Sequence, residues 1–125
     1  MTDTTTLPPV WRRLIAIVAA EYRVEPELIR SRSRIREVIP PRQTMMWIGH
    51  RVMGRSLNQV GRYLDRDHST VLHAVREIDA QRATDAGLVA RIDRIVAALA
   101  TEHPLRLAHA MHRVPDMANS PPRAA

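Results

Sequence analysis

Residues 66–76, with the sequence RDHSTVLHAVR, set the tightest limits on how this chain can fold. Asp67 is a good N-cap residue, because its carboxylate can accept hydrogen bonds from the free backbone N–H groups of a first helical turn. Three polar residues follow it. Beyond them, apolar residues recur at helical spacing, namely Val71, Leu72, Val75 and Ile78. The pattern predicts a helix with an exposed polar first turn and a buried apolar stripe.

A second short helix is predicted just before this one, over residues 56–64, and Asp65 and Arg66 leave a tight connection between the two. Helix, short turn and helix is the pattern of a helix-turn-helix motif. The polar first turn is what such a motif presents to base edges in a DNA major groove. From this stretch alone, a DNA-binding motif and an ordinary helical hairpin are about equally favoured.

Residues 66–76 closely resemble the signature of the C-terminal DNA-binding domain of the bacterial replication initiator DnaA. A second block, residues 31–34 with residues 41–43, resembles the same domain in the same order and spacing. The resemblance runs from about Leu14 to about Leu99. It implies an all-α fold, a small helical bundle with a helix-turn-helix like that of DnaA domain IV or the Trp repressor. It also implies sequence-specific binding of double-stranded DNA as a monomer, in a stand-alone chain without the ATPase.

The resemblance and the residue chemistry together suggest which side chains contact DNA. His68, Ser69 and Thr70 are expected to contact base edges in the major groove, with Asp67 as the cap and a further acceptor for a cytosine amine. In the resembled family an arginine at the position of Arg34 enters the minor groove. Further phosphate or groove contacts are expected from Arg42, Gln43, Arg55 and Arg76, with Arg32 and Arg36 as additions.

The distribution of charge supports a polyanionic partner. The formal net charge is +6, and all 19 basic residues are arginine. Residues 30–66 contain nine arginines and two acidic residues, a net charge of +7, whereas the rest contains ten arginines and eleven acidic residues, a net charge of −1. An excess confined to the middle of the chain points to nucleic acid. A membrane is not favoured, because no long amphipathic apolar face accompanies the basic run. The expected location is the cytoplasm, at the nucleoid.

The chain is predicted to form one helix-turn-helix domain at residues 10–101, between a disordered arm at residues 1–9 and a flexible tail at residues 102–125. Trp11 is expected to pack in the core rather than to stack on bases. The apolar stripe of the last helix is also expected in the core, with a surface for a partner helix as the alternative. The remaining helices are expected at residues 10–22, 24–29, 42–53 and 86–101.

The sequence gives little support for catalysis or metal binding. Residues 67–69 spell a Ser–His–Asp triad, but consecutive helical residues point about 100° apart, so no relay can form within one turn. His103, His109 and His112 lack a carboxylate or thiol partner at metal-ligand spacing. The sequence contains no cysteine and no GxxxxGK[ST] phosphate loop. We therefore expect a protein that is not an enzyme and holds no metal or cofactor.

The expected role is transcriptional regulation. Some activators of phage-like gene-transfer particles carry a similar domain, which suggests a promoter-recognition subunit that acts with RNA polymerase or a sigma-like partner. One alternative is competition with the full initiator at its boxes, which would regulate DNA replication. The alternative from a different class is a protein-interaction module whose basic middle binds an acidic partner.

The chain departs from the resembled family at four positions. Family members usually have a glycine pair before the Arg-Asp-His motif, where this chain has Leu64 and Asp65. Pro40 and Glu77 stand where basic residues are common. Glu77 is expected on the second helix of the motif, where it would repel a nearby phosphate. The resemblance therefore does not identify the exact DNA sequence, or box, that the chain would bind.

Overall fold

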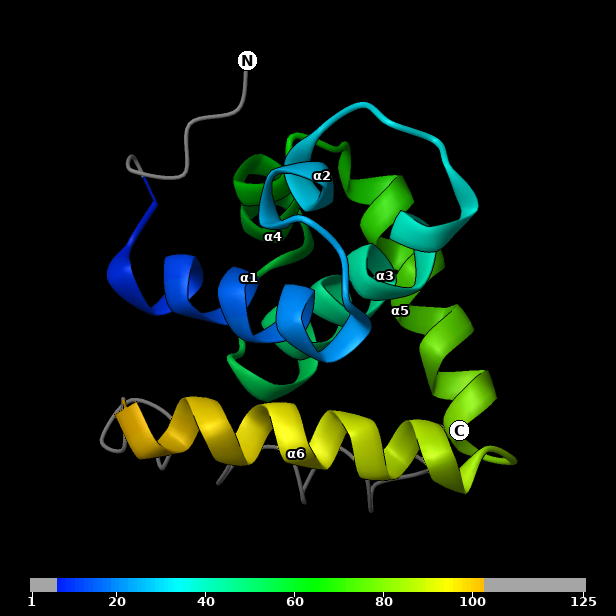
Figure 1. Ribbon diagram of the computed structural model, residues 1–125. Coiled ribbons are helices and arrows are strands. Elements are labelled where there is room, and N and C mark those ends of the chain that lie inside the picture. The colour runs from blue at the N-terminus through cyan, green and yellow to red at the C-terminus, as the bar shows by residue number, and fades with distance from the viewer. Residues whose placement is uncertain (1–6, 103–125) are drawn as a thin grey trace.

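The computed structural model describes residues 7–102, and helices account for the regular secondary structure over that range (Figure 1). This confirms the predicted all-α fold. In chain order the elements are α1 (Pro9–Tyr22), α2 (Pro26–Arg30), the 3-10 turn η2 (Arg36–Val38), α3 (Ile39–Trp47), the π-helical turn η3 (Ile48–Val52), α4 (Leu57–Leu64), α5 (His68–Arg82) and α6 (Ala86–Glu102).

The ordered domain begins and ends at different residues from those predicted. Leu7 is only 6% exposed and belongs to the core, and α1 begins at Pro9, so ordered structure starts inside the predicted arm. At the other end, α6 extends to Glu102, one residue into the predicted tail. The rest of the predicted arm, residues 1–6, and of the predicted tail, residues 103–125, lies outside the described residues.

The central helix differs from its prediction in where it starts and how it ends. One helix was predicted over residues 42–53, whereas α3 begins at Ile39 and passes at Ile48 into the π turn η3. The Met53 N–H donates to the carbonyl of Ile48 at 2.9 Å, which closes that wider turn. This helix is enclosed in the core, because Met45, Met46 and Ile48 are at most 1% exposed.

Trp11 joins three helices in the core. Its side chain is fully buried, and its ring lies 4.7 Å from that of Tyr63 on α4, measured between ring centres. A Cβ at Gly49 would come within 2.4 Å of Trp11 Cη2, so the absence of a side chain at Gly49 lets η3 approach the indole. Trp11 is therefore a packing residue, as the sequence predicted.

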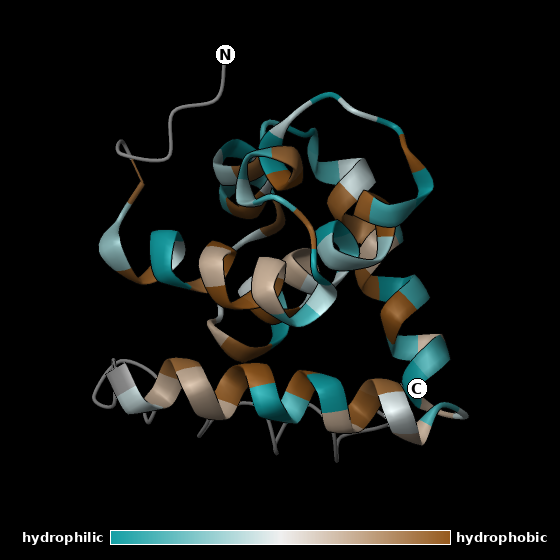
Figure 2. Ribbon diagram, viewed as in Figure 1, coloured by the Kyte–Doolittle hydropathy of each residue, from teal (hydrophilic) through white to brown (hydrophobic). Residues whose placement is uncertain are grey.

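The long helix α6 runs along α1 on one side of the molecule (Figure 1). Apolar residues recur along α6 (Figure 2). Ile92, Ile95 and Leu99 among them are at most 2% exposed, so the stripe is buried. The loop at residues 31–35 lies on the opposite side of the molecule (Figure 1). None of the helices within residues 7–102 combines the length and apolarity that crossing a bilayer requires.

Candidate nucleic-acid interface

The first turn of α5 is fixed by a local set of hydrogen bonds. The Asp67 carboxylate accepts from the Thr70 backbone N–H at 2.9 Å and from the Ser69 hydroxyl at 2.7 Å. The predicted N-cap is thereby confirmed. The Thr70 N–H, followed by the Ser69 hydroxyl, lowers the pKa of Asp67 from 3.8 to about 2, so this cap is ionised at neutral pH.

Beyond the cap, α5 separates an exposed tip from a buried stripe. The side chains of His68, Ser69 and Thr70 are exposed, whereas Val71 and Val75 on the same helix are at most 1% exposed. We call residues 67–70 the tip. The stripe packs α5 against α3 and α4, and this packing leaves the tip projecting from the body of the bundle.

The turn between α4 and α5 depends on a close backbone approach. The Arg66 N–H donates to the carbonyl of Gly61 at 2.7 Å, and a Cβ at Gly61 would lie 2.3 Å from the Arg66 carbonyl oxygen. Asp65 adopts the left-handed conformation, with φ 58°. An aspartate thus takes the backbone conformation that glycine adopts most easily, in a turn where the resembled family usually carries glycines.

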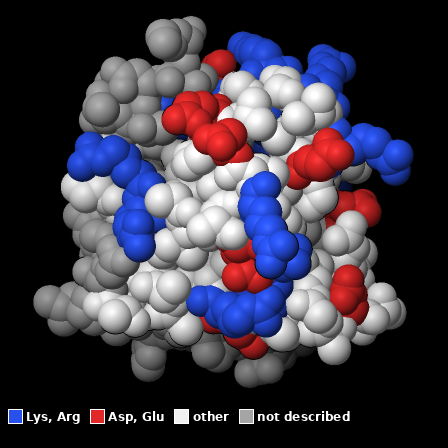
Figure 3. All heavy atoms as spheres, in the orientation of Figure 1, with Lys and Arg blue, Asp and Glu red and all other residues white. Residues whose placement is uncertain are grey.

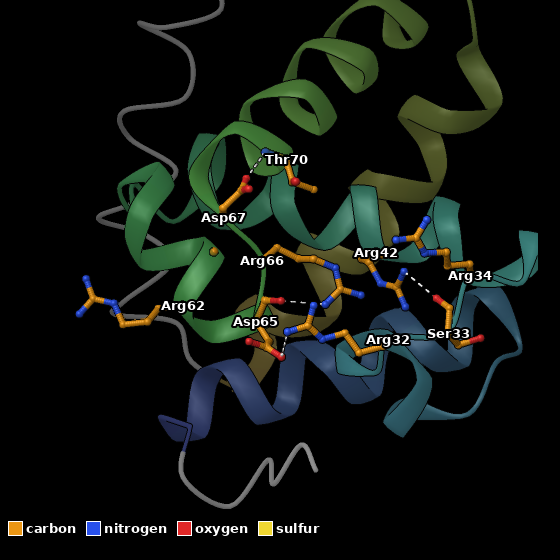
Figure 4. Close-up of a pocket in the computed structure, with 10 residues that line it drawn as sticks. Arg32, Ser33, Arg34, Arg42, Arg62, Asp65, Arg66, Asp67 and Thr70 are labelled. Carbon is orange, nitrogen blue, oxygen red and sulfur yellow. Dashed lines mark hydrogen bonds and ion pairs between the residues drawn. The ribbon is translucent and has the colours of Figure 1, made fainter.

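An open hollow of about 740 Å³ lies between this turn and the loop at residues 31–35 (Figure 4). Five arginines line it, together with Asp65, Asp67 and Thr70 of the helix-turn-helix. Arg34 and Arg42, two of the predicted contact residues, are therefore brought to the same place as the tip. The five arginines are Arg32, Arg34, Arg42, Arg62 and Arg66.

Arg42 is the buried arginine of the hollow, and its guanidinium is bound within the protein. The Nε donates to the carbonyl of Ile29 at 2.9 Å. The Nη2 donates to the carbonyls of Leu28 at 2.8 Å and Ser31 at 3.2 Å, and the Nη1 donates to that of Ser33 at 3.1 Å. The residue is 8% exposed. Arg42 thus fixes the path of the loop from inside, whereas the sequence suggested a contact to DNA.

Arg66 binds the same loop from the helix-turn-helix side. Its Nη2 donates to the Ser31 carbonyl at 2.5 Å, the carbonyl that also accepts from Arg42. Its Nη1 donates to the carbonyls of Leu64 and Asp65. Burial, with the adjacent positive charges of Arg32 and Arg34, lowers the pKa of Arg66. Burial, followed by the charge of Arg66, lowers the pKa of Arg42 to about 10.

Two serines shape the loop locally. The Ser31 hydroxyl donates to the Leu28 carbonyl at 2.8 Å and accepts from the Ser33 N–H at 3.1 Å. The Ser33 hydroxyl accepts from the Ile35 N–H at 3.4 Å. Such side-chain bonds to nearby backbone hold an irregular segment without a helix or strand. The alternating serines therefore shape the backbone, while the arginines at residues 32 and 34 remain exposed.

The other predicted contact residues lie outside the hollow. Gln43 and Arg55 are half-buried, and Arg76 is exposed on α5. The His50 ring Nδ1 lies 2.8 Å from the Arg55 carbonyl oxygen, which ties the segment before α4 to η3.

The sequence did not identify Arg62 or Arg66 as part of the site. Arg62 extends from α4 away from the other arginines, whereas Arg66 points toward the loop (Figure 4). The charge pattern of the sequence could have pointed to both arginines, because both lie within the basic segment at residues 30–66. Only the folded turn shows that they line the same hollow as Arg32 and Arg34.

Opposite charges compensate each other on other parts of the surface. Arginine and acidic side chains are interspersed on the face seen in Figure 3. Between α1 and α6, Glu21 accepts from Arg94 at 2.6 Å and pairs with Arg91 at 3.4 Å, and the hydrogen bond from Arg94 is the main cause of the lowered pKa of Glu21. The hollow differs from this pattern, because five arginines face two aspartates there.

Within residues 7–102, no group of three or more histidine, aspartate or glutamate side chains is arranged to hold a metal ion. The three histidines considered for a metal site, His103, His109 and His112, lie outside the described residues.

Comparison with known proteins shows that the chain is similar to the helix-turn-helix part of bacterial DnaA proteins. Residues 12–78 match the family model described as the bacterial dnaA protein helix-turn-helix. The chromosomal replication initiator protein DnaA of Deinococcus deserti is 35% identical over 78 residues, which is 62% of this chain and 17% of that protein. Those of Sphingopyxis alaskensis and Caulobacter vibrioides are 42% identical over 79 residues and 45% identical over 71, covering 62% and 56% of this chain but only 17% and 14% of the relative.

Proposed function

The chain belongs to the bacterial DnaA helix-turn-helix family, and on that premise we propose that it binds double-stranded DNA in a sequence-specific manner. The observation that carries the proposal is the exposed, capped tip at residues 67–70 beside a hollow lined by five arginines. Direct recognition needs hydrogen-bonding side chains at base edges, and affinity needs cations at phosphates. The site offers both within one short stretch of surface.

The tip is assigned to the major groove. His68, Ser69 and Thr70 are exposed on a helix whose buried stripe holds it rigidly against α3 and α4. The Ser69 hydroxyl donates to Asp67, so its oxygen can still accept a hydrogen bond from a base. Recognition helices place the side chains of their first turns against base edges in this way.

The loop is assigned to the minor groove and the adjacent backbone. Arg34 is exposed at the rim of the hollow and is proposed to enter the minor groove. The proposed phosphate contacts are Arg32, Arg55, Arg62 and Arg76, with Gln43 and Arg36 as further candidates. Arg42 is reassigned from a DNA contact to a positioning residue, because its hydrogen bonds are made to the loop backbone.

This footprint predicts a salt dependence. About five neutralised phosphates give a log–log slope of affinity against salt concentration of about −4 to −5. A slope shallower than about −2 would contradict the footprint.

The test of the proposed function is selection of bound sequences from a random duplex pool at about 150 mM salt. The variants are the wild type, His68→Ala/Ser69→Ala at the tip, and Thr84→Ala/Thr101→Ala as a matched control at exposed positions away from the hollow. One enriched motif that the tip variant loses and the control keeps would support base recognition. No motif with the wild type would contradict the proposal and favour an acidic protein as the partner of the basic segment.

We also propose that the binding serves transcriptional regulation, with RNA polymerase or a sigma-like protein as partner and a monomer on DNA. Two departures from the family favour a DNA target sequence different from the initiator's. One is Asp65 in the turn, and the other is Glu77 on α5, which accepts a hydrogen bond from Gln81. A carboxylate beside a phosphate is repulsive, so the backbone contacts at both positions should differ from those of the family. Mapping of bound sites in cells distinguishes promoters from initiator boxes, where the chain would compete with the full initiator and act on replication.

A further inference from the structure

The large hydrophobic side chains exposed in the described part of the chain are two isoleucines, Ile35 at 49% and Ile39 at 43%. Single exposed apolar residues are common on protein surfaces and usually need no explanation. Here the two isoleucines lie within five residues, Ile35 in the arginine-rich loop at residues 31–35 and Ile39 at the start of α3. Val38 between them is fully buried. Exposed apolar surface is thus concentrated beside the strongest positive charge.

The backbone holds Ile35 in one position. Its N–H donates to the Ser33 hydroxyl, and its carbonyl accepts from the Val38 N–H at 3.2 Å. The residue has φ −64° and ψ 146° at the start of η2. An apolar side chain presented from a fixed backbone loses little conformational freedom when it is covered, which favours a binding role.

The charges on either side narrow down what can cover this side chain. Arg34 and Arg36 flank Ile35 directly, and both are exposed. The surface that covers it must therefore be anionic at its edges and apolar between them. A DNA minor groove has this form, because phosphates border it and the C–H groups of deoxyribose line its walls. A lipid surface fits less well, since membrane binding needs a broad apolar face rather than one side chain.

Resting on the proposed DNA binding, we infer that Ile35 is a specificity residue of the minor-groove contact. Its side chain packs against the deoxyribose walls beside Arg34 and disfavours base pairs that project a guanine 2-amino group into the groove. Of the standard base pairs, only those with guanine carry a donor there, so the contact distinguishes A·T from G·C.

The experiment measures binding of the selected duplex by fluorescence anisotropy. The base step that faces the loop is first located as the one whose preference is lost in a selection with Arg34→Ala. At that step, G·C is compared with inosine·C, which lacks the 2-amino group and leaves the major groove unchanged. For the wild type we expect inosine·C to bind roughly tenfold more tightly than G·C.

Ile35→Ser and Ile35→Ala are expected to reduce that ratio to about twofold and to leave the salt slope unchanged, because no charge is removed. Arg34→Ala, in contrast, should make the slope shallower by about one. Ile39→Ser is the matched control, since it makes the same change at an isoleucine of similar exposure outside the arginine run. It should retain the wild-type ratio. Thermal melting checks that all variants are folded.

An unchanged ratio in both Ile35 variants would overturn the inference, and so would an equal reduction in Ile39→Ser. In either case a motif selected by the wild type would leave the proposed function standing. If the wild type selected no motif, the proposed function itself would fail, so the two failures are distinguishable. Normal DNA binding by the Ile35 variants would leave a protein partner as the better candidate to cover this side chain.

Discussion

The tip and the arginine loop are both exposed and both polar, yet they are held in different ways. The tip at residues 67–70 is stabilised by its own first turn, in which Asp67 accepts from Thr70 and Ser69. The loop at residues 31–35 has no helix of its own, and guanidinium groups from α3 and from the α4–α5 turn bind its carbonyls. The tip is ordered by local sequence alone, whereas the loop also depends on side chains distant in sequence.

The difference divides four arginines in and around the loop into two groups. Arg42 and Arg66 direct their N–H groups toward protein carbonyls and hold the loop. Arg32 and Arg34 are exposed on the loop that these bonds hold. A count of positive charges therefore overstates the number of phosphate contacts. The positioning arginines should affect stability or geometry, and the exposed ones should affect affinity and its salt dependence.

The largest effect is expected from Arg42→Met. Methionine keeps the aliphatic length but removes four hydrogen bonds to the carbonyls of the α2–loop segment. Hydrogen bonds from a charged donor contribute more than neutral ones, so the free energy of unfolding should fall by about 3 kcal/mol. Urea unfolding followed by circular dichroism measures this fall.

Arg36→Met is the control for this prediction, because Arg36 is an exposed arginine of the same basic segment. Its free energy of unfolding should stay within about 0.5 kcal/mol of the wild type. If Arg42→Met were as stable as this control and instead gave a shallower salt slope, Arg42 would be the phosphate contact that the sequence first suggested.

Arg66 connects the two regions, and its replacement should weaken DNA binding by roughly tenfold. The expected loss comes from geometry, since the Ser31 carbonyl is the point at which the turn holds the loop. Arg66→Lys keeps the charge but cannot reach three carbonyls with one planar group, so it should lose nearly as much affinity as Arg66→Met. Titration of the selected duplex measures both variants.

Arg62→Met provides the comparison for Arg66, because Arg62 lines the same hollow but points away from the loop. It should weaken binding by only about two- to threefold and make the salt slope shallower by about one. A normal affinity for Arg66→Lys would show that Arg66 acts through its charge alone.

The sequence predicted the tip better than the loop, and the reason is the range of the interactions. The Asp67 cap and the stripe of Val71, Val75 and Ile78 are local patterns, and the structure confirms both. The loop depends on a bond across 35 residues, from Arg66 to Ser31, which no local pattern encodes.

Part of the signal for Arg42 was nevertheless present. Arg42 precedes Met45 and Met46 by three and four residues, so a helix places it on the same inward face as these two buried side chains. Its chemistry suggested an exposed contact, and its helical position suggested a buried one. The position proved the better guide. The π turn at Ile48–Val52 had no comparable signal, because it ends the helix and no further helical turn follows in which a changed spacing could show.

A smaller effect tests the local character of the tip through pH. The pKa of Asp67 is lowered to about 2, so the stability from its ionised form is fully present above pH 3.8 and is lost as the pH falls through about 2. Carbon-13 NMR of the carboxyl group should give a midpoint near pH 2, and Ser69→Ala should raise it. Asp67→Asn keeps a capping side chain that does not titrate. Its melting temperature should therefore fall less between pH 4 and pH 2 than that of the wild type. A midpoint near 4 would contradict the cap geometry.

The smallest effect is expected from Asp65→Asn, which removes the ion pair between the α4–α5 turn and the loop. The Asp65 carboxylate pairs with Arg32 at 3.2 Å, but both side chains are more than half exposed, so the pair contributes little to stability. Asparagine tolerates the left-handed backbone at this position, and the fold should therefore be unchanged. Loss of one negative charge from the hollow should free Arg32 for a phosphate and raise DNA affinity about two- to threefold at low salt, with the gain fading as salt screens it. Arg32→Ala/Asp65→Asn should abolish the gain. A gain that persisted in the double variant would place the effect on the turn rather than on the loop.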